Sequence, residues 1–356
     1  MKSTTYPSPS SLTLGVLALA IAGMVAGASQ AKPTTVEEVA NYRGADRQAV
    51  LEAGARKEGN LLLYATGTQI KPLMEEFSKK YPFIKVQLQR ANSTKTARKV
   101  LEEYKAGFYK VDGFELASHG LIPIRDRGYL QAFYSPEAKH YDKAAKDTKG
   151  FWIGVRESYG GIGYNTKLIS SGDAPKTWKD LLLPRFKDKM AISSSTGTVG
   201  NWTGVLVLAY GEDFVRELGK QNIKIFKMSS RALTNLVTSG EVLVAARASN
   251  AHIAKSLKKG APLAWVDPGP VAVTDTVVAL AKKAPHPHAM MLMADFLLSK
   301  EGQKMYVNLG YASARVDVKN DIVPSQKMYL ANRPNFTEEF KVWVKLFNEV
   351  FRRKRR

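Results

Sequence analysis

Hydroxyl and amide side chains recur in this 356-residue chain where an apolar segment ends and a helical pattern begins. Four such turns are Thr66-Gly67-Thr68, Asn92-Ser93-Thr94, Ser193 to Gly197, and Ser229-Ser230. The first turn of a helix has free backbone N–H groups at the positive end of the helix dipole, so it attracts anions and polar oxygens. One such turn is also an ordinary helix cap. Four together favour a binding surface, whose expected contacts are Thr66, Thr68, Ser93, Thr94, Ser195 and Thr196.

Three arginines lie beside these turns or beside apolar segments. Arg156 lies in the apolar stretch 151–164, Arg231 follows Ser229-Ser230, and Arg247 follows the apolar run 242–246. A guanidinium group donates to two oxygens at once and keeps its proton, which suits a carboxylate, phosphonate or phosphate. The alternative is that each arginine pairs with a surface carboxylate. We expect Arg156 to contribute most, with three further candidate contacts: Ser118, Tyr159 and Asn250.

Residues for catalysis or metal binding are scarce. The chain has no cysteine, so thiol nucleophiles and thiolate metal sites are excluded. The sequence has no zinc-protease, serine-hydrolase or phosphate-loop motif. His286 and His288 are the one close histidine pair, and Pro287 between them is typical of a helix start, so we expect a structural role. We therefore expect a binding protein with no cofactor and no metal rather than an enzyme.

Strand-like and helical patterns alternate along the chain. Residues 61–64 and 84–88 read as strands, and 72–81 and 95–105 read as helices. A second series has strands at 190–193 and 242–246, with helices that include 205–210, 231–239 and 250–259. This alternation predicts an α/β fold with parallel strands, in which ligands bind at the carboxyl ends of the strands. Segments 151–164 and 271–281 read as strand-like crossovers between the two series.

The N-terminus has the layout of a secretory signal peptide. Lys2 is the only charge in the first 31 residues, Leu12 to Val25 is apolar, and small residues lead to Ala31. We expect cleavage after Ala31, with Ala28 as the second choice. The alternative is an uncleaved anchor, although the apolar run is shorter than the ~20 residues that span a membrane. Without a cysteine there is no lipid-acceptor thiol, so a lipoprotein is not expected.

The net charge is +21, and the chain closes on the basic run of residues 352–356. Such a charge suits nucleic acid, an anionic surface or an anionic ligand, and is also compatible with solvated lysines. No helix combines clustered arginines with interleaved aromatic residues, so we expect no nucleic-acid partner. The basic run is a block of like charges, which we expect to stay solvated and outside the site.

Several stretches resemble extracellular solute-binding proteins of the ferric-iron or polyamine type. The resemblance is carried by residues 164–168, 173–182 and 184–192, which are similar to the family's YNTKL, P-x-TW-x-DLL and AI segments, and by residues 259–266 and 296–304. Together these stretches lie within residues 58–318. The resemblance implies the type II periplasmic fold, with two α/β lobes, two strand-like crossovers and a ligand cleft between the lobes.

Combined with the residue patterns, the resemblance gives a domain plan. We expect a signal peptide at 1–31, a first lobe from 32–155, a second lobe from 156–274, and completion of the first lobe by 275–356, including C-terminal helices and the basic tail. The expected function is capture of a small polar, anionic solute in the periplasm by lobe closure. The expected partner is the membrane permease of an ABC importer, and the protein is expected to be a monomer.

Two alternatives stay open at this point. Iron-binding members of the family carry adjacent tyrosines in a stretch that reads Arg247-Ala248-Ser249-Asn250-Ala251-His252 here, so the resemblance does not extend to the iron ligands. A ferric-iron protein is therefore the second choice. A secreted enzyme on the same two-lobed fold is less favoured, because no nucleophile and base can be assembled from the motifs.

Overall fold

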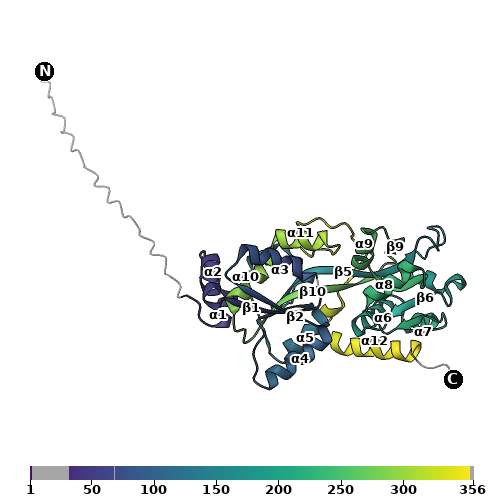
Figure 1. Ribbon diagram of the computed structural model, residues 1–356, viewed down its shortest axis with the longest axis horizontal. Coiled ribbons are helices and arrows are strands. Elements are labelled where there is room, and N and C mark those ends of the chain that lie inside the picture. The colour runs from purple at the N-terminus through teal and green to yellow at the C-terminus, as the bar shows by residue number, and fades with distance from the viewer. Residues whose placement is uncertain (2–31, 68, 353–356) are drawn as a thin grey trace. The chain divides into compact units, whose positions relative to one another are not determined.

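Two long strands run side by side through the molecule. In the computed structural model, which describes residues 1, 32–67 and 69–352, strands β5 (Trp152–Asn165) and β10 (Val271–Ala281) pair in antiparallel fashion. They are the segments expected as crossovers, and Figure 1 shows them passing from one group of helices to the other. All of β5 is buried. The predicted signal peptide, Thr68 and the last four residues of the basic tail lie outside the described residues.

The sheet continues outward from this central pair on both sides. Its strand order is β2-β1-β3-β10-β5-β8-β6-β7, and short strands add to β10 and β5. Strands β1 and β2 pair in parallel, as do β1 and β3, β6 and β7, and β6 and β8. The antiparallel pairs β3–β10 and β5–β8 join these two parallel sets to the centre. The mixed sheet therefore holds two parallel sets of strands, as the alternating sequence pattern predicts.

The first lobe comprises the elements around β1, β2 and β3. Its strands and helices up to β5 are α1 (Val36–Asn41), α2 (Arg47–Glu58), β1 (Asn60–Ala65), α3 (Ile70–Lys80), β2 (Lys85–Arg90), α4 (Ser93–Lys105), β3 (Gly113–Ala117), α5 (Ser118–Asp126), β4 (Leu130–Gln131), η1 (Pro136–His140) and η2 (Lys143–Ala145). The chain returns to this lobe after β10 with α10 (Pro287–Leu298) and α11 (Lys300–Asn308).

The second lobe comprises the elements between β5 and β10. They are η3 (Trp178–Leu182), η4 (Pro184–Phe186), β6 (Met190–Ser193), α6 (Thr196–Tyr210), α7 (Glu212–Gly219), β7 (Lys224–Phe226), α8 (Ser230–Ser239), β8 (Val244–Ser249), α9 (Asn250–Leu257) and β9 (Leu263–Val266). The chain ends with β11 (Lys327–Met328), η5 (Leu330–Asn332) and α12 (Phe336–Phe351).

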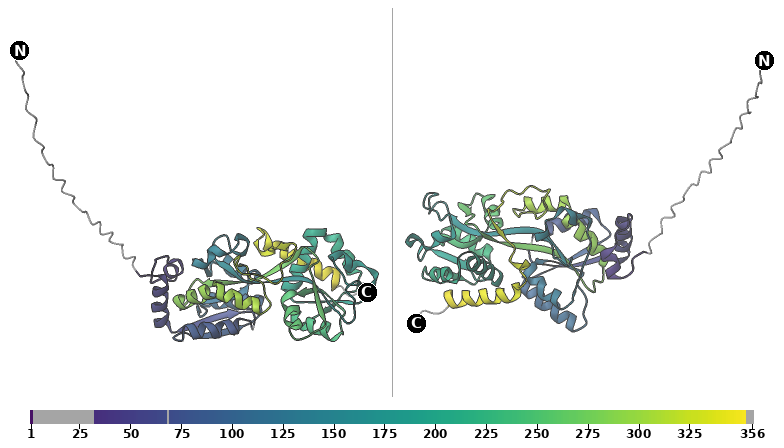
Figure 2. Two further views of the ribbon diagram at one scale, coloured as in Figure 1. Left: turned by 90° about the horizontal axis from the view of Figure 1, so that it is seen from above. Right: turned by 180° about the vertical axis from the view of Figure 1, so that it is seen from behind.

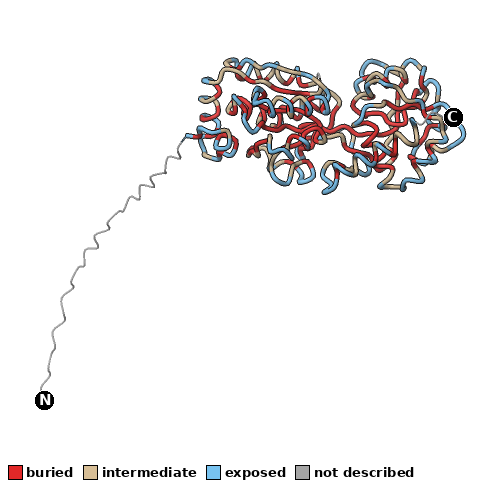
Figure 3. Tube along the Cα trace, turned by 90° about the horizontal axis from the view of Figure 1, so that it is seen from below, coloured by how far each residue is buried: buried red, intermediate tan, exposed pale blue. Residues whose placement is uncertain are grey.

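Each lobe has its own hydrophobic core. Leu63, Phe77 and Met290 belong to a large buried cluster of the first lobe. Trp178, Leu206 and Val244 belong to a cluster in the second lobe. Figure 3 shows buried chain in both lobes and along the strands that connect them. Residues 33–356 form one compact unit, so the lobe boundaries expected at 155/156 and 274/275 stay predictions.

Helix α12 contributes to both cores. Phe336 at its start and Trp343 at its middle belong to the first-lobe cluster, whereas Leu346 and Phe347 belong to the second-lobe cluster. Figure 2 shows this helix in yellow along the second lobe, where it packs against α6. The domain plan placed the whole of 275–356 with the first lobe, and the packing of α12 shows that its second half lies on the second lobe.

Several helices begin earlier than the sequence pattern indicated. Helix α6 begins at Thr196 although the apolar run begins only at residue 205, because glycines and threonines interrupt the apolar pattern in its first turns. Strand β8 extends to Ser249, so Arg247 lies within the strand and not after it. Such extensions bring the polar turns closer to the centre of the molecule than a pattern of apolar residues alone can show.

Candidate functional site

A cavity of about 600 Å³ lies between the lobes and is lined by polar residues from both. The amino-terminal ends of α4, α5, α6, α8 and α9 contribute to its wall, together with the turn before α3 and the central strands β5, β8 and β10. Residues that line it include Thr66, Gln69, Asn92, Ser93, Thr94, Lys95, His119, Arg156, Ser158, Ser195, Thr196, Thr198, Asn201, Ser230, Arg247, Ser249, His252, Thr274, Thr276 and Tyr311. Converging helix starts give the cavity a positive potential.

Most of the residues predicted from the sequence lie in this cavity. They are Thr66, Ser93, Thr94, Arg156, Ser195, Thr196 and Arg247. The turns at 66–67, 92–95 and 194–198 therefore come together although they are far apart in sequence. Thr68 lies outside the described residues. Their role in binding a ligand stays a prediction.

Four predicted residues are not part of the cavity lining, and each has a polar atom hydrogen-bonded to a neighbouring protein group. Ser118 donates to Asp275 Oδ1 at 2.7 Å, and Tyr159 donates through its hydroxyl to Glu157 Oε2 at 2.9 Å. The Asn250 side chain accepts from the Tyr159 backbone N–H at 2.7 Å. Arg231 donates to the His252 carbonyl oxygen at 2.6 Å and lies behind the wall. These four lie outside the cavity lining, and their contact with a ligand stays a prediction.

Arg156 has a protein carboxylate as its partner. Its Nε donates to Glu115 Oε1 at 2.8 Å, and 7% and 0% of the two residues are exposed. Its guanidinium also lies over the Tyr311 ring at 4.6 Å from the centroid. The Glu115 charge compensates that of Arg156, so Arg156 contributes little net charge to the cavity. From the sequence, Arg156 was the arginine expected to contribute most to ligand binding. Because Glu115 pairs with it, we now expect the larger contribution from Arg247.

Arg247 lies in the same cavity without such a partner. Only 5% of it is exposed, and its Nη2 donates to Thr274 Oγ1 at 3.0 Å. Among the described residues, no carboxylate lies within ion-pair distance of it, and its Nε is buried with no acceptor. Burial lowers its pKa to about 10, so the guanidinium is still charged at neutral pH. A buried charge without a partner is unfavourable, so an anion beside Arg247 would be favourably placed.

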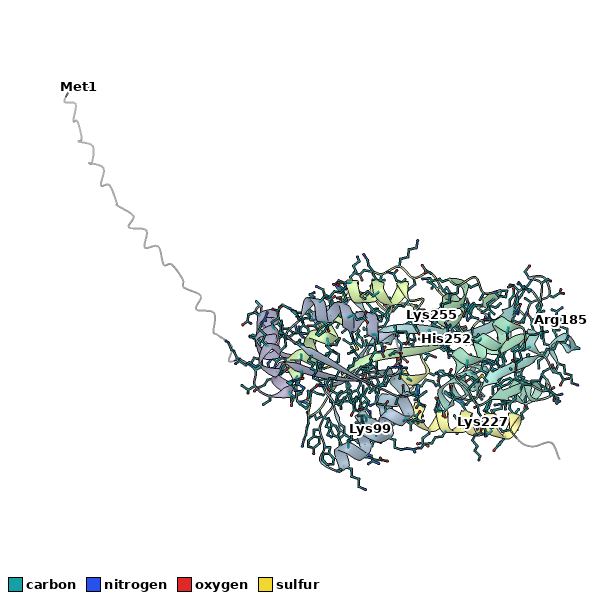
Figure 4. All side chains as sticks on the ribbon, in the orientation of Figure 1. Met1, Lys99, Arg185, Lys227, His252 and Lys255 are labelled. Carbon is teal, nitrogen blue, oxygen red and sulfur yellow. The ribbon has the colours of Figure 1, made fainter. Side chains whose placement is uncertain are left out.

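Two histidines line the cavity as neutral groups. Burial lowers the pKa of His119 to about 4. Burial, reinforced by Arg231, Arg247, Arg156 and Lys255, lowers the pKa of His252 to about 3. Figure 4 labels His252 and Lys255, which lie on α9. At neutral pH these imidazoles offer hydrogen bonds and no charge.

Sequence reasoning missed several lining residues that one signal could have found. Side chains two positions apart on a strand point to the same face. Ser158 follows Arg156 by two on β5, and Ser249 follows Arg247 by two on β8, and all four residues line the cavity. Tyr311, by contrast, comes from a loop that only the tertiary fold brings here.

The cavity differs from a metal centre in its donor atoms. Within the described ranges, its lining contains no carboxylate, and no group of three His, Cys, Asp or Glu side chains is placed to hold a metal ion. A hard cation such as Fe(III) prefers several anionic oxygen ligands. The ferric-iron alternative therefore gains no support from this site. No described helix has the length and apolar character needed to cross a membrane.

The family of this chain follows from comparison with known proteins. The pattern of the family described as bacterial extracellular solute-binding protein matches residues 122–333, which is more than half of the chain. The chain belongs to this family. Solute-binding proteins are the class that the sequence predicted, and the class is one of binding proteins and not of enzymes.

Named relatives of this solute-binding protein differ in their ligands. A putative 2-aminoethylphosphonate-binding periplasmic protein of Salmonella typhimurium is 27% identical over 53% of this chain. The match covers 58% of that relative's length. A spermidine/putrescine-binding periplasmic protein of Haemophilus influenzae is 26% identical over 77% of this chain and 80% of its own. The names of these proteins refer to an aminophosphonate and to polyamines, so similarity alone does not identify the solute.

Solved structures confirm the type II periplasmic binding protein fold. Iron-bound HitA from Pseudomonas aeruginosa superimposes with a TM-score of 0.68 at 22% identity, covering 82% of this chain and 99% of HitA. AfuA from Actinobacillus pleuropneumoniae, with fructose-6-phosphate bound, gives a TM-score of 0.69 at 22% identity, covering 83% and 99%. At this identity the similarity concerns the fold alone.

Proposed function

We propose that this protein captures a small anionic solute in the cavity between its lobes and delivers it to the membrane permease of an ABC importer. Membership of the solute-binding family supports the capture role. The polar cavity lined from both lobes supports closure on the ligand, as in hinge-bending binding proteins. We also propose that the protein is exported to the periplasm, since the names of its relatives describe periplasmic proteins.

The observation that carries the choice of an anion is Arg247. It is buried, lines the cavity and has no carboxylate partner among the described residues. A cationic solute such as a polyamine would lie beside this charge and beside the positive helix ends, and the described lining offers no carboxylate to hold it. An anionic solute would instead complete the hydrogen bonds and the charge that Arg247 lacks.

The first test is a thermal-shift screen of the mature protein. Carboxylates, phosphonates, sugar phosphates, polyamines and ferric ion would each be added at increasing concentration. A ligand at 100 times its dissociation constant stabilises the folded state by ~2.7 kcal/mol, which gives a clear shift of Tm. Stabilisation by anions supports the proposal, and stabilisation by polyamines or ferric ion alone contradicts it.

The second test is calorimetric titration of Arg247→Gln with the best anion from the screen. Loss of a charge-assisted hydrogen bond predicts an affinity ten- to hundredfold lower, ~1.5–3 kcal/mol. Arg98→Gln is the matched control, because Arg98 is exposed on α4 and does not line the cavity. Equal affinity of Arg247→Gln and the parent would show that the anion binds elsewhere.

Export has its own test. We propose cleavage by signal peptidase after Ala31, with Ala28 as the second choice, because small residues precede both positions. Amino-terminal sequencing of protein recovered from the periplasm would identify the cut. A mature chain that still begins at Met1 would contradict cleavage and favour an anchored protein.

A further inference from the structure

One wall of the cavity contains several polar atoms that lack partners. This wall, the second-lobe wall, is formed by Ser230, Arg247, Ser249, His252 and the first turn of α6 (196–198). Within the described part of the chain, Ser230 Oγ, Arg247 Nε and His252 Nδ1 are buried and make no hydrogen bond. Buried polar atoms usually have a hydrogen-bond partner, so three unpartnered ones around a single cavity are suited to contact a bound polar ligand.

The charge of this wall is also uncompensated. Arg247 lines it and Arg231 lies directly behind it, donating to the His252 carbonyl oxygen. Neither guanidinium forms an ion pair among the described residues, whereas Arg156 on the central strand is neutralised by Glu115. Arg247 in the lining, Arg231 behind it and the positive end of α6 together favour a ligand that bears two negative charges.

The opposite wall differs in its charge, although Gln69 Oε1 on it is also buried without a hydrogen-bond partner among the described residues. Thr66, Gln69, Asn92, Ser93 and Thr94 of the first lobe line it with neutral hydroxyl and amide groups. Lys95 is the cation of this wall, and its side chain is exposed. The cavity therefore has one strongly positive wall and one mainly neutral polar wall.

We infer that the solute bears a doubly charged tetrahedral oxyanion, a phosphate monoester or a phosphonate, which binds the second-lobe wall. This inference rests on the proposed capture of an anion and narrows its class. A tetrahedral group presents three oxygens and accepts more hydrogen bonds than the two oxygens of a carboxylate. Arg247, Ser230, Ser249 and the backbone N–H groups of α6 supply more donors than one carboxylate can accept.

The charge of the second-lobe wall stays constant over the pH range in which a phosphate monoester loses its second proton. A phosphate monoester loses its second proton at a pKa of about 6. His252, which faces Arg231 on α8, Arg247 on β8, Arg156 on β5 and Lys255 on α9, is neutral throughout this range. Asp275 on β10 is the neighbouring group that titrates there, since burial and the nearby Glu157 raise its pKa to about 6.

The experiment compares two probes of one shape on the unmodified protein. Methyl phosphate is a dianion at pH 7.5, while methyl sulfate is a monoanion at every pH. Calorimetry is expected to show methyl phosphate binding at least about tenfold tighter, with acetate weaker still. The affinity for methyl phosphate is expected to fall as pH drops through about 6, and that for methyl sulfate to stay constant. Asp275→Asn should leave both profiles unchanged.

A variant of Ser230 provides an independent test of the second-lobe wall. Ser230→Ala removes a buried hydroxyl that has no hydrogen-bond partner within the described ranges. The ligand-free protein should therefore keep or raise its Tm, while methyl phosphate binds about tenfold more weakly. If Ser230 had a purely structural role, its replacement would lower the Tm of the ligand-free protein together with the affinity for methyl phosphate. An unchanged affinity for methyl phosphate would remove Ser230 from the site and overturn the wall as described.

The outcomes separate this inference from the proposed function. If acetate or methyl sulfate binds as tightly as methyl phosphate, the dianion class is wrong and anion capture stands. If the pH profile disappears in Asp275→Asn, the titrating group belongs to the protein, and the dianion class is also wrong. If no anionic probe binds at millimolar concentration, or if putrescine binds in their place, both the inference and the proposed function are wrong.

Discussion

Arg156 and Arg247 show how one residue type takes two roles within a single cavity. Both are buried and both line the cavity. Arg156 has Glu115 at 2.8 Å, whereas among the residues that the structure describes Arg247 bonds only to the Thr274 hydroxyl, at 3.0 Å. The first arginine is therefore part of the protein's own charge balance, and the second is the one that we propose for ligand binding.

Replacing Arg156 with Ala is expected to destabilise the protein. It would leave Glu115, which is fully buried, without its charge partner, at a cost of ~3–5 kcal/mol. Urea unfolding measures the loss. The double variant Arg156→Ala/Glu115→Gln should recover part of it, because the uncompensated charge is gone. A single variant as stable as the parent would show that Glu115 is protonated or solvated in the folded state.

Gly160 provides the space for the Arg247 guanidinium. A Cβ at this position would lie 2.6 Å from Arg247 Nε, so Gly160→Ala must displace the end of a flexible side chain. We expect the affinity for the anion to fall about tenfold or more, with a small change in stability. Calorimetry together with thermal unfolding checks both. Loss of stability without loss of affinity would mean that the backbone, and not Arg247, moves.

At the scale of elements, α12 is the helix whose packing was least evident from the sequence. Trp343 contacts the surface of α6 at Gly204, where a Cβ would lie 2.5 Å from the indole ring. Phe340 on the same helix stacks on His119, with ring centroids 6.1 Å apart. Helix α12 thus connects the start of α5, in the first lobe, to α6 in the second lobe.

Trp343→Ala is expected to lower the free energy of unfolding by ~3–5 kcal/mol, because it removes a large buried side chain and leaves a cavity against α6. Val342→Ala is the matched control on the same helix, since Val342 is 53% exposed, and it should change stability by no more than about 0.5 kcal/mol. Urea unfolding of both variants provides the comparison. Equal stability of the two would mean that α12 does not pack on α6 in solution.

For the whole molecule, the buried histidines predict loss of stability in acid. The pKa values of His252 and His119 are lowered to about 3 and about 4, from an ordinary value of 6.5. Between pH 6.5 and 4 the unfolded chain therefore binds more protons, and the free energy of unfolding falls as pH falls, by up to ~1.4 kcal/mol per pH unit for each group. Asp275, whose pKa is raised to about 6, acts in the opposite direction and offsets one histidine.

Urea unfolding measured at intervals across this range checks the sign. The double variant His119→Gln/His252→Gln should remove the fall or reverse it, because Asp275 then dominates in this pH range. Asp275→Asn should make the fall steeper. A slope unchanged in the double variant would show that other carboxylates control acid stability.

The sequence by itself determined the class of the protein. Alternating apolar and helical patterns gave the α/β elements, and the motif around 164–192 indicated the solute-binding family that comparison confirmed. Residues of the predicted turns 66–68, 92–94, 193–197 and 229–230 line one cavity, because helix starts follow strand ends in this class of fold, and their role in binding a ligand stays a prediction.

Only the tertiary structure decided which arginines of the described chain pair with a carboxylate. Arg156, Arg231 and Arg247 have the same side chain in similar local patterns, and no local pattern tells which of them meets a carboxylate. Glu115 is 41 residues from Arg156, and it reaches this arginine only through the sheet order β3-β10-β5. Charge balance depends on contacts across the sheet, and those contacts depend on strand order, which a pattern of neighbouring residues does not contain.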